Sequence, residues 1–314
     1  MLQNLNSLST SLAEIIIVDS GEEKLSSVEY QSFEHLSIQY VISEKSVCVQ
    51  RNIGIRLARS PWIFLCDDDI EVHADYLQIL YDYINHHPEA GAVSGLILQK
   101  ENSEWISTYP ITSSKQLVWK FIFQLGIWGE INCPGKNFII KRIKNFYSQK
   151  GNHVSKAGWP VNTNFSGDYT ICRVYGLGAS LVKKEWLIDS PYDEILDAHG
   201  IGDNYGVISG FPVSEVHVVN KALVYHHREP TNRLKSSIQY YRRVIALDYF
   251  RKIKKTPVPV SKGWLLWSLI GNFIDFFLAG QWKGAKATMK AWLLILFNCN
   301  PYLKAKNRKQ AHKN

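Results

Sequence analysis

Short apolar runs alternate with helical segments along the first hundred residues, and this pattern restricts the fold more than any other feature. Two of the runs end in acidic residues, one at Asp19 and the other at the triplet 67–69. Strands that alternate with helices predict an α/β domain with a mostly parallel sheet, and ligands of such sheets bind beyond the carboxyl ends of the strands. We therefore expect both acidic endings to lie at a ligand site. The expected elements are strands over residues 14–19, 61–66 and 90–98 and helices over residues 47–59 and 74–86.

Beyond residue 100 the pattern is less regular. Residues 101–174 mix aromatic, Lys and Asn residues, with a helix expected near residues 115–125. Small apolar residues at 176–182 predict a strand to which a ligand or another backbone can approach closely. The remaining expectations are a strand over residues 215–226, a basic helix over residues 231–255, a hinge at Pro257 and Pro259, and a strongly apolar stretch over residues 263–280.

Composition excludes several classes of protein. A chain of 314 residues with 46% hydrophobic content is too apolar to be disordered, and its five scattered cysteines form neither a CxxC clamp nor a disulfide scaffold. The start of the chain lacks the pattern of a secretory signal. Residues 233–314 contain 17 Lys and Arg against two acids and carry a net charge of +15, whereas residues 1–232 carry −7. This asymmetry indicates that the two parts face different partners.

The triplet Asp67-Asp68-Asp69 follows an apolar strand directly, which places three carboxylates at one strand end. Adjacent carboxylates repel one another unless a cation lies among them, and hard divalent ions such as Mg²⁺ and Mn²⁺ prefer oxygen ligands. Successive side chains of an extended chain point to opposite faces, so Asp67 and Asp69 would face the ion together. A solvated acidic loop is the alternative that the triplet alone leaves open.

Several segments, in their order along the chain, carry a family resemblance. Residues 50–59 with 62–69 resemble the family 2 glycosyltransferases of the GT-A fold, in which an R-N-x-G helix leads into a strand ending in an acidic D-x-D motif. The resemblance covers about residues 10–250. Within the family, the sequence is most similar to the enzymes that build bacterial surface polysaccharides. The other matching segments are residues 15–21 (the nucleotide-contacting strand), 176–184 (the G-x-x-x … R-R acceptor-side strand), and 191–194 with 200–203 (the F-D-E … G-E-D segment that holds the catalytic base).

The resemblance implies a metal-assisted, inverting sugar transfer from a nucleotide-diphosphate donor. Asp67 and Asp69 would hold Mg²⁺ or Mn²⁺, which stabilises the departing diphosphate as a Lewis acid. Asp203 aligns with the family's base, which takes the proton of the acceptor hydroxyl. The match departs from the family at Gly202, because the residue before the base is usually Glu. The alternative candidates for the base, which also fit a structural role at a helix start, are Asp193 and Glu194.

Four further residues are candidates for nucleotide-sugar binding. Asp19 is a nucleotide contact by resemblance, and an Asp in the sequence Asp-Ser-Gly is also a turn former. Arg51 can offset phosphate charge or lie on a solvated helix face. Asn52 contacts substrate or fixes the loop before the acidic strand, and Asp68 completes the set.

His226 ends the expected strand over residues 215–226, and His227 follows it directly. Some related transferases place a His at the position of His226 as a further metal or diphosphate contact. Side chains alternate along a strand, so only one of His226 and His227 can face the site. A surface His with ordinary hydrogen-bond partners is the alternative.

The amino terminus differs from the family pattern. Family members begin with an apolar strand and a nucleotide-cradling loop, followed by a helix. Here residues 2–12 have leucines near helical spacing and already resemble that helix, so the opening strand is expected to be absent. A truncated start or weak nucleotide binding would account for this pattern.

The carboxyl-terminal part combines positive charge with apolar surface. Residues 239–243 resemble the Q-x-x-R-W motif of processive synthases without its Trp, and a basic helix packed on the catalytic body is the preferred interpretation. Residues 263–280 approach the length of a membrane span, but Asn272 and Asp275 make spanning costly. Tryptophans and lysines near its ends favour an in-plane position on an anionic membrane surface, and a helical subdomain with solvated charges is an equal alternative. Nucleic-acid binding is disfavoured by the acidic body.

These observations predict a GT-A-like catalytic domain over residues 1–230 and a basic helical extension over residues 231–314. Within the domain, residues 1–100 would bind nucleotide and residues 101–230 the acceptor. The expected function is glycosyl transfer to a glycan or lipid-linked acceptor in cell-surface polysaccharide biosynthesis, in the cytoplasm at the inner membrane face. A catalytically inactive scaffold for glycan-assembly enzymes and a nucleotidyltransferase are the alternatives.

Overall fold

A computed structural model of the chain describes residues 1–33, 35–135, 137–227, 234–254 and 260–311. The chain divides into two compact units. The first comprises Met1–Ser107, Gly167–Ile171 and Tyr175–Pro230, and the second comprises Thr108–Ser166, Cys172–Val174 and Thr231–Asn314. Residues 108–166, which the sequence placed with the amino-terminal domain, therefore group with the carboxyl-terminal residues.

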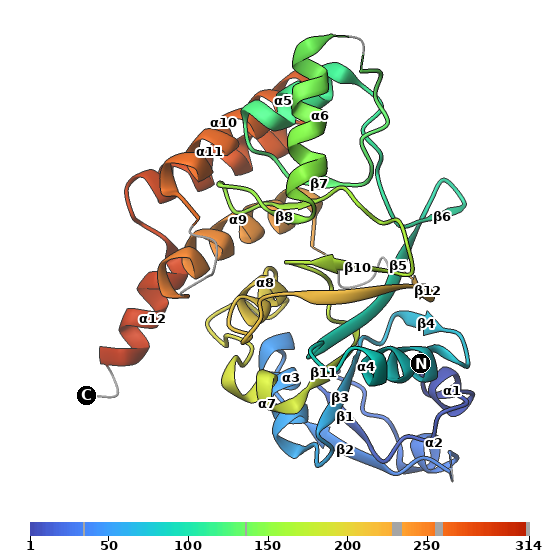
Figure 1. Ribbon diagram of the computed structural model, residues 1–314. Helices are drawn as coiled ribbons and strands as arrows, with labels where there is room; N and C mark the ends of the chain where they lie inside the picture. The colour runs from blue at the N-terminus through green and yellow to red at the C-terminus, as the bar shows by residue number, and fades with distance from the viewer. Residues whose placement is uncertain (34, 136, 228–233, 255–259, 312–314) are drawn as a thin grey trace. The chain divides into compact units, whose positions relative to one another are not determined.

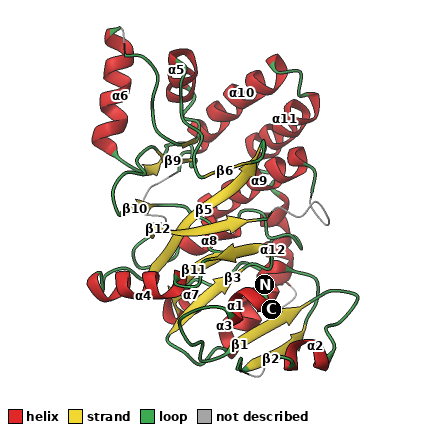
Figure 2. Ribbon diagram, turned by 90° about the vertical axis from the view of Figure 1, so that its right-hand side faces the viewer, coloured by secondary structure: helices red, strands yellow, loops and turns green. Residues whose placement is uncertain are grey.

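The first unit is a mixed α/β structure, shown by ribbon in Figures 1 and 2. Its long strands and helices lie close to the sequence expectation, while several short elements were not foreseen. The helices are α1 (Leu2–Asn6), α2 (Ser27–Gln31), α3 (Val47–Leu57), α4 (Tyr76–His86), α7 (Lys184–Asp189) and α8 (Asp203–Ile208). The strands are β1 (Ile15–Asp19), β2 (Ile38–Ile42), β3 (Trp62–Cys66), β4 (Ile70–Val72), β5 (Ala92–Glu101), β6 (Glu104–Ile106), β10 (Tyr169–Cys172), β11 (Ala179–Lys183) and β12 (Val216–His226).

A seven-stranded sheet with the order β10-β12-β5-β11-β3 forms the centre of the first unit, with β4 paired to β12 and β6 paired to β5. Strand β12 is parallel to β5, and β11 runs antiparallel to both β5 and β3. Strands β3, β5 and β12 therefore run in one direction, and their carboxyl ends lie at one edge (Figure 2). The predicted α/β architecture is confirmed. Strands β1 and β2 form a separate parallel pair.

The core of this unit lies where α4 packs on β5 and β12. Tyr76 of α4 is fully buried, and its hydroxyl donates a hydrogen bond to the Ala179 carbonyl at 2.5 Å and accepts one from the Gly95 amide at 2.8 Å. These bonds satisfy buried polar groups of β5 and β11, whose orphaning would be costly. The apolar residues around Tyr76 are Ile70, Val72, Leu77, Leu80, Ile84, Ala90, Val93, Ala179, Val219, Ala222 and Val224.

The amino-terminal helix is shorter than the leucine spacing predicted, since α1 ends at Asn6 and not at residue 12. Hydrogen bonds to a distant segment account for the difference. The Asn4 side-chain nitrogen donates to the Val72 carbonyl at 2.8 Å, and its side-chain oxygen accepts from the Val72 amide at 3.0 Å. The Ser9 backbone amide donates to the Ala74 carbonyl. These bonds tie residues 4–9 to residues 72–74, and the chain after α1 continues in turns and bends. Within the described residues the first strand is β1, and its described strand partner is β2.

The second unit is mainly helical. A cluster around Ile111, Leu117, Ile140 and Tyr147 holds its first helices together. A small sheet of order β7-β9-β8 links these helices, so the irregular part of the sequence contains short strands that no periodicity could reveal. The helices are α5 (Ser114–Ile122), α6 (Phe138–Lys150), α9 (Ser236–Ile253), α10 (Lys262–Leu278), α11 (Trp282–Leu296) and α12 (Pro301–Ala311). The strands are β7 (Ile127–Trp128), β8 (His153–Val154) and β9 (Pro160–Asn162).

Helix α9, the described part of the expected basic helix, packs against α11 and α12. Its Asp248 is fully buried and pairs with Arg251 at 2.8 Å, while the Asn300 amide donates to Asp248 at 2.9 Å and to the Ile245 carbonyl at 2.9 Å. A buried charge requires such partners. The expected hinge at residues 257 and 259 lies outside the described residues.

Candidate active site

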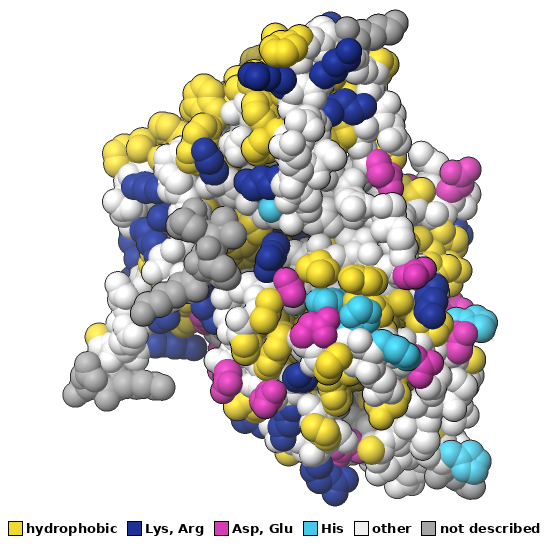
Figure 3. Space-filling view, viewed as in Figure 1, with side chains coloured by type: hydrophobic (Ala, Val, Ile, Leu, Met, Phe, Trp, Pro, Cys, Tyr) yellow, Lys and Arg dark blue, Asp and Glu magenta, His cyan; other side chains and the backbone are white. Residues whose placement is uncertain are grey.

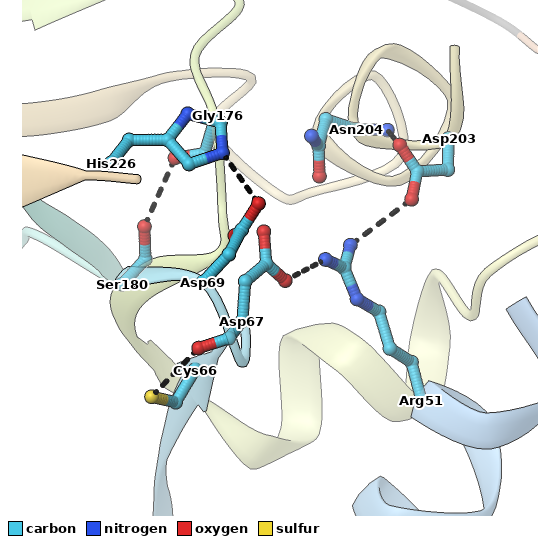
Figure 4. A network of polar contacts seen from close by, with 9 residues as sticks. All are labelled: Arg51, Cys66, Asp67, Asp69, Gly176, Ser180, Asp203, Asn204 and His226. Carbon is cyan, nitrogen blue, oxygen red and sulfur yellow. Dashed lines mark hydrogen bonds and ion pairs between the residues drawn. The ribbon is translucent and has the colours of Figure 1, made fainter. Parts of the chain in front are cut away.

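The acidic turn of residues 67–69 follows β3 directly and lies beside the end of β12, in the network drawn in Figure 4. Backbone hydrogen bonds fix the turn on both sides. The Asp67 amide donates to the Gly178 carbonyl at 2.7 Å, and the His227 amide donates to the Asp69 carbonyl at 2.8 Å. Because β3 and β12 run in the same direction, their carboxyl ends bring the acidic turn and His226 together at one edge of the sheet.

Arg51 of α3 connects two carboxylates that the sequence assigned to different roles. Its Nη2 lies 2.5 Å from Asp67 Oδ1, and its Nη1 lies 3.0 Å from Asp203 Oδ2. The guanidinium also lies over the ring of Tyr192, with 5.0 Å to the centroid. The planar, two-armed guanidinium suits such a bridge, which an ammonium group could not make in the same way. The Arg51 side chain is 17% exposed and points into the site, not to a solvated helix face.

Asp203 is the first residue of α8, and the backbone before it explains the departure from the family sequence. Gly202 has φ = 97°, a left-handed conformation that Glu would adopt only with strain. The Asn204 amide donates to Asp203 Oδ1 at 2.6 Å. Burial raises the pKa of Asp203 to about 6, against the opposing effect of the Arg51 charge. Asp203 is therefore ionised at neutral pH but binds a proton more readily than an ordinary carboxylate.

The two histidines point to different partners, as strand alternation predicted. His226 Nε2 lies 3.1 Å from Asp69 Oδ2, and His227 Nε2 lies 2.9 Å from Glu71 Oε2. The His226 side chain thus contacts the acidic turn. Asp68 is exposed, and partial desolvation with its acidic neighbours raises its pKa.

The three predicted metal ligands, Asp67, Asp69 and His226, fit Mg²⁺ or Mn²⁺ in donor type, because carboxylate and imidazole groups bind these ions. Asp69 and His226 are already in contact, whereas the Asp67 carboxylate is paired with Arg51. Among the described residues, no group of three or more His, Cys, Asp and Glu side chains is placed to hold a metal ion. The donor types suit these ions, and a metal site formed by all three residues stays a prediction.

The backbone of Gly178 lies close to Asp67. A Cβ at Gly178 would lie 1.9 Å from Asp67 Oδ2, so any other residue would displace that carboxylate. The small-residue run at 176–182 predicted a close approach at this strand. Its importance for Asp67 in particular could not be read from the sequence.

Asn52 is buried and holds a loop of the same unit. Its side-chain oxygen accepts from the Tyr192 amide at 3.0 Å, and its amide group donates to the Tyr192 carbonyl at 2.8 Å and to Glu194 at 2.9 Å. Asp193 accepts from the Ile195 amide. Asn52 therefore positions the loop that carries Tyr192, and the contacts of Asp193 and Glu194 fit a structural role in that loop.

Asp19 ends β1 and closes the turn that follows. It accepts hydrogen bonds from the Tyr40 hydroxyl and from the Gly21 amide, the latter at 2.7 Å, and the Tyr40 bond lowers its pKa. Lys183 and Lys184, which matched the acceptor-side motif, donate to the carbonyls of Pro88 and Ala58 instead of approaching the acidic turn.

Comparisons with known proteins show what the chain is similar to. Residues 1–145 match the model of the family described as glycosyl transferase family 2. A glucosyl-dolichyl phosphate glucuronosyltransferase of Haloferax volcanii is 20% identical over 163 residues, which are 49% of this chain and 48% of that protein. The chain thus matches about half the length of this curated relative.

Solved structures show the fold. TarS residues 1–349 of S. aureus, in complex with UDP-GlcNAc, match with a TM-score of 0.51 and 12% identity, over 93% of this chain and 76% of theirs. The mannosyltransferase PcManGT of Pyrobaculum calidifontis, in complex with GDP-Man and Mn²⁺, matches with a TM-score of 0.50 and 12% identity, over 95% and 82%. The predicted GT-A-type fold is confirmed by these neighbours.

Proposed function

We propose that the chain transfers a sugar from a nucleotide-diphosphate donor to a hydroxyl of a lipid-linked or glycan acceptor, and the match of residues 1–145 to the glycosyl transferase family 2 model supports this. The Arg51 guanidinium carries this proposal, since it holds Asp67 of the acidic turn and Asp203 of α8 at one point. Group transfer requires that the leaving-group side and the base reach the same substrate. The Arg51 bridge supports such a placement for two carboxylates that lie far apart in the sequence.

In this proposal Asp203 is the general base of an inverting transfer. Its carboxylate would take the proton of the acceptor hydroxyl while the sugar–phosphate bond breaks on the opposite face of the sugar. The raised pKa, about 6, supports this role because it leaves the group ionised at neutral pH yet able to hold a proton. Arg51 orients the carboxylate and limits the rise of its pKa.

The donor diphosphate would lie at the acidic turn. Asp67, Asp69 and His226 would hold Mg²⁺ or Mn²⁺, which supplies Lewis-acid stabilisation of the charge on the departing diphosphate. Asp68 and Asp19 would contact the nucleotide sugar, with Asp19 fixed by its bond from Tyr40. Apart from His226, the residues proposed to bind the donor lie within residues 1–100.

The acceptor and the pathway are also part of the proposal. The Haloferax relative is named for a sugar carried on dolichyl phosphate. A lipid-linked sugar is therefore our first choice of acceptor, in the assembly of a cell-surface polysaccharide. An acceptor of this kind would require the protein to work at a membrane surface.

The decisive experiment measures nucleoside diphosphate release by the purified full chain with UDP- and GDP-sugars, Mn²⁺ and a glucosyl polyprenyl phosphate. We expect release in the wild type and a roughly 10²–10⁴-fold lower kcat in Asp203→Asn, the range typical of general-base loss. Asp82→Asn, an exposed change on α4, is the matched control. Donor binding without any release would instead indicate the inactive scaffold, and pyrophosphate release would indicate a nucleotidyltransferase.

A further inference from the structure

Helices α10 and α11 form a hairpin that exposes large apolar side chains on its outer surface. The hairpin turns at Gly280, and the side chains around this tip are among the most exposed apolar groups of the second unit: Leu278 is 77% exposed and Trp282 is 58% exposed. Soluble proteins rarely leave such groups together in water without a function. The α10–α11 face is defined by the exposed residues Phe277, Leu278, Trp282, Met289, Leu293, Leu296 and Phe297.

An apolar groove of about 180 Å³ runs between the two helices on this hairpin. The hydroxyl of Thr288, which lines it, already donates to the Gly284 carbonyl at 2.8 Å. The groove therefore offers hydrocarbon contact and little polar chemistry. Its lining residues are Leu269, Ile270 and Phe273 of α10 and Thr288, Met289 and Trp292 of α11.

Positive charge surrounds the α10–α11 face. Lys283 and Lys286 are exposed on the first turns of α11, next to the apolar tip. Residues 262–311 contain eight Lys and Arg and one acid, Asp275. Figure 3 shows apolar and basic side chains gathered over these helices. A second copy of the chain would bring like charges together at this face, whereas an anionic surface would neutralise them.

We propose that the α10–α11 face binds an anionic lipid bilayer and lies in the plane of its interface. The apolar tip around Leu278 and Trp282 enters the acyl region, and Lys283 and Lys286 contact the headgroup phosphates. Amphipathic helices with apolar and Trp side chains on one side and Lys on the flanks bind membranes in this manner. Within the described residues, none of the helices has both the length and the hydropathy of a membrane span. The proposal does not depend on the transfer reaction.

Flotation of the full chain with vesicles tests the proposal. We expect binding to phosphatidylcholine vesicles that contain 30% phosphatidylglycerol, and weak binding to phosphatidylcholine alone or at high salt. Lys283→Gln with Lys286→Gln should lower the partition coefficient about 30-fold, from the usual contribution of each Lys near an anionic surface. Lys221→Gln with Arg56→Gln, two exposed basic residues of the first unit, is the matched control and should bind like the wild type.

A second variant tests the apolar tip. Leu278→Asp with Trp282→Ser changes two highly exposed side chains, so it should fold normally and bind vesicles at least tenfold more weakly. Trp fluorescence of the wild type should be quenched by brominated acyl chains, which reports entry into the hydrocarbon region.

Equal binding to neutral and anionic vesicles, or wild-type binding by both variants, would overturn the proposal. Dimerisation in sedimentation that the tip variant abolishes, without vesicle binding by the wild type, would assign the face to a second copy instead. Vesicle binding is measured without donor sugar, so its failure is independent of any failure of nucleotide release.

Discussion

Replacement of Arg51 tests the central feature of the site. Arg51→Met removes the cation that pairs with Asp67 and Asp203, whose side chains are 39% and 11% exposed. Loss of one partner of a buried ion pair costs about 3–5 kcal/mol. Because Asp67 is partly solvated and Asp203 can take up a proton, we expect a smaller loss of unfolding free energy, about 2–3 kcal/mol at pH 8.

The loss should depend on pH with a defined sign. Burial already raises the pKa of Asp203 above its ordinary value, and Arg51 opposes that rise. Without Arg51 the folded-state pKa rises further, so the unfolding free energy of Arg51→Met should recover as the pH falls through 6 towards 4. The acid limb of the activity profile should move upward by roughly one pH unit, about 1.4 kcal/mol of lost interaction.

Urea unfolding at pH 5 and pH 8, with nucleotide release measured from pH 5 to 9, provides the test. Arg51→Lys keeps one charge but cannot bridge two carboxylates with a rigid fork, so its effects should be intermediate. Arg56→Met, an exposed change on the same helix, is the control for helix propensity and charge. Unchanged stability and an unchanged acid limb in Arg51→Met would refute the argument.

Three further predictions concern neighbouring features. Gly178→Ala should weaken donor binding at least tenfold, about 1.4 kcal/mol, because its Cβ would lie 1.9 Å from Asp67 Oδ2. Gly176→Ala serves as control, since its Cβ would meet the apolar Ile97 side chain at 3.0 Å; equal affinities of the two variants in calorimetry would contradict this. Tyr76→Phe leaves the buried Ala179 carbonyl and Gly95 amide without the hydroxyl that bonds them, and it should lower the unfolding free energy by about 1–3 kcal/mol in urea titrations. An unchanged unfolding free energy would show that these two hydrogen bonds do not stabilise the fold. Asp203→Asn removes a group with a raised pKa, so the wild type should lose stability relative to this variant as the pH rises from about 4 to 6; parallel pH profiles of the two proteins would count against that pKa.

The main elements of the first unit were predictable because their sequence patterns are strong. The strand before Asp67 is a continuous apolar run, and the helix before it has a Ser46 side chain that accepts from the Val49 amide at its start. Helix α1 was overestimated because leucine spacing contains no information about Asn4, whose amide bonds Val72 in a distant strand. Local periodicity describes a helix face, and tertiary hydrogen bonds decide where that helix ends.

The candidate site was predictable in its members but not in its connections. The family resemblance identified Asp67 and Asp203, since their motifs are local in the sequence. The Arg51 bridge between them depends on three elements meeting in space, and both a solvated face and a phosphate contact were equally compatible with the helix pattern. Sequence comparison alone identifies Gly202 only as a departure from the family motif. The positive φ of Gly202 explains why a glycine stands at this position.

The buried Asp248 of α9 limits how far the protein can be truncated from its carboxyl end. Asn300, which precedes α12, donates one of its hydrogen bonds, and α11 and α12 cover the helix on which Asp248 lies. A truncated protein that ends before Asn300 would leave the Asp248 carboxylate paired with Arg251 but without the Asn300 hydrogen bond, a loss of about 1.5–3 kcal/mol. Shortened versions of the protein for crystallisation should therefore retain Asn300 and helix α12, which packs on α9.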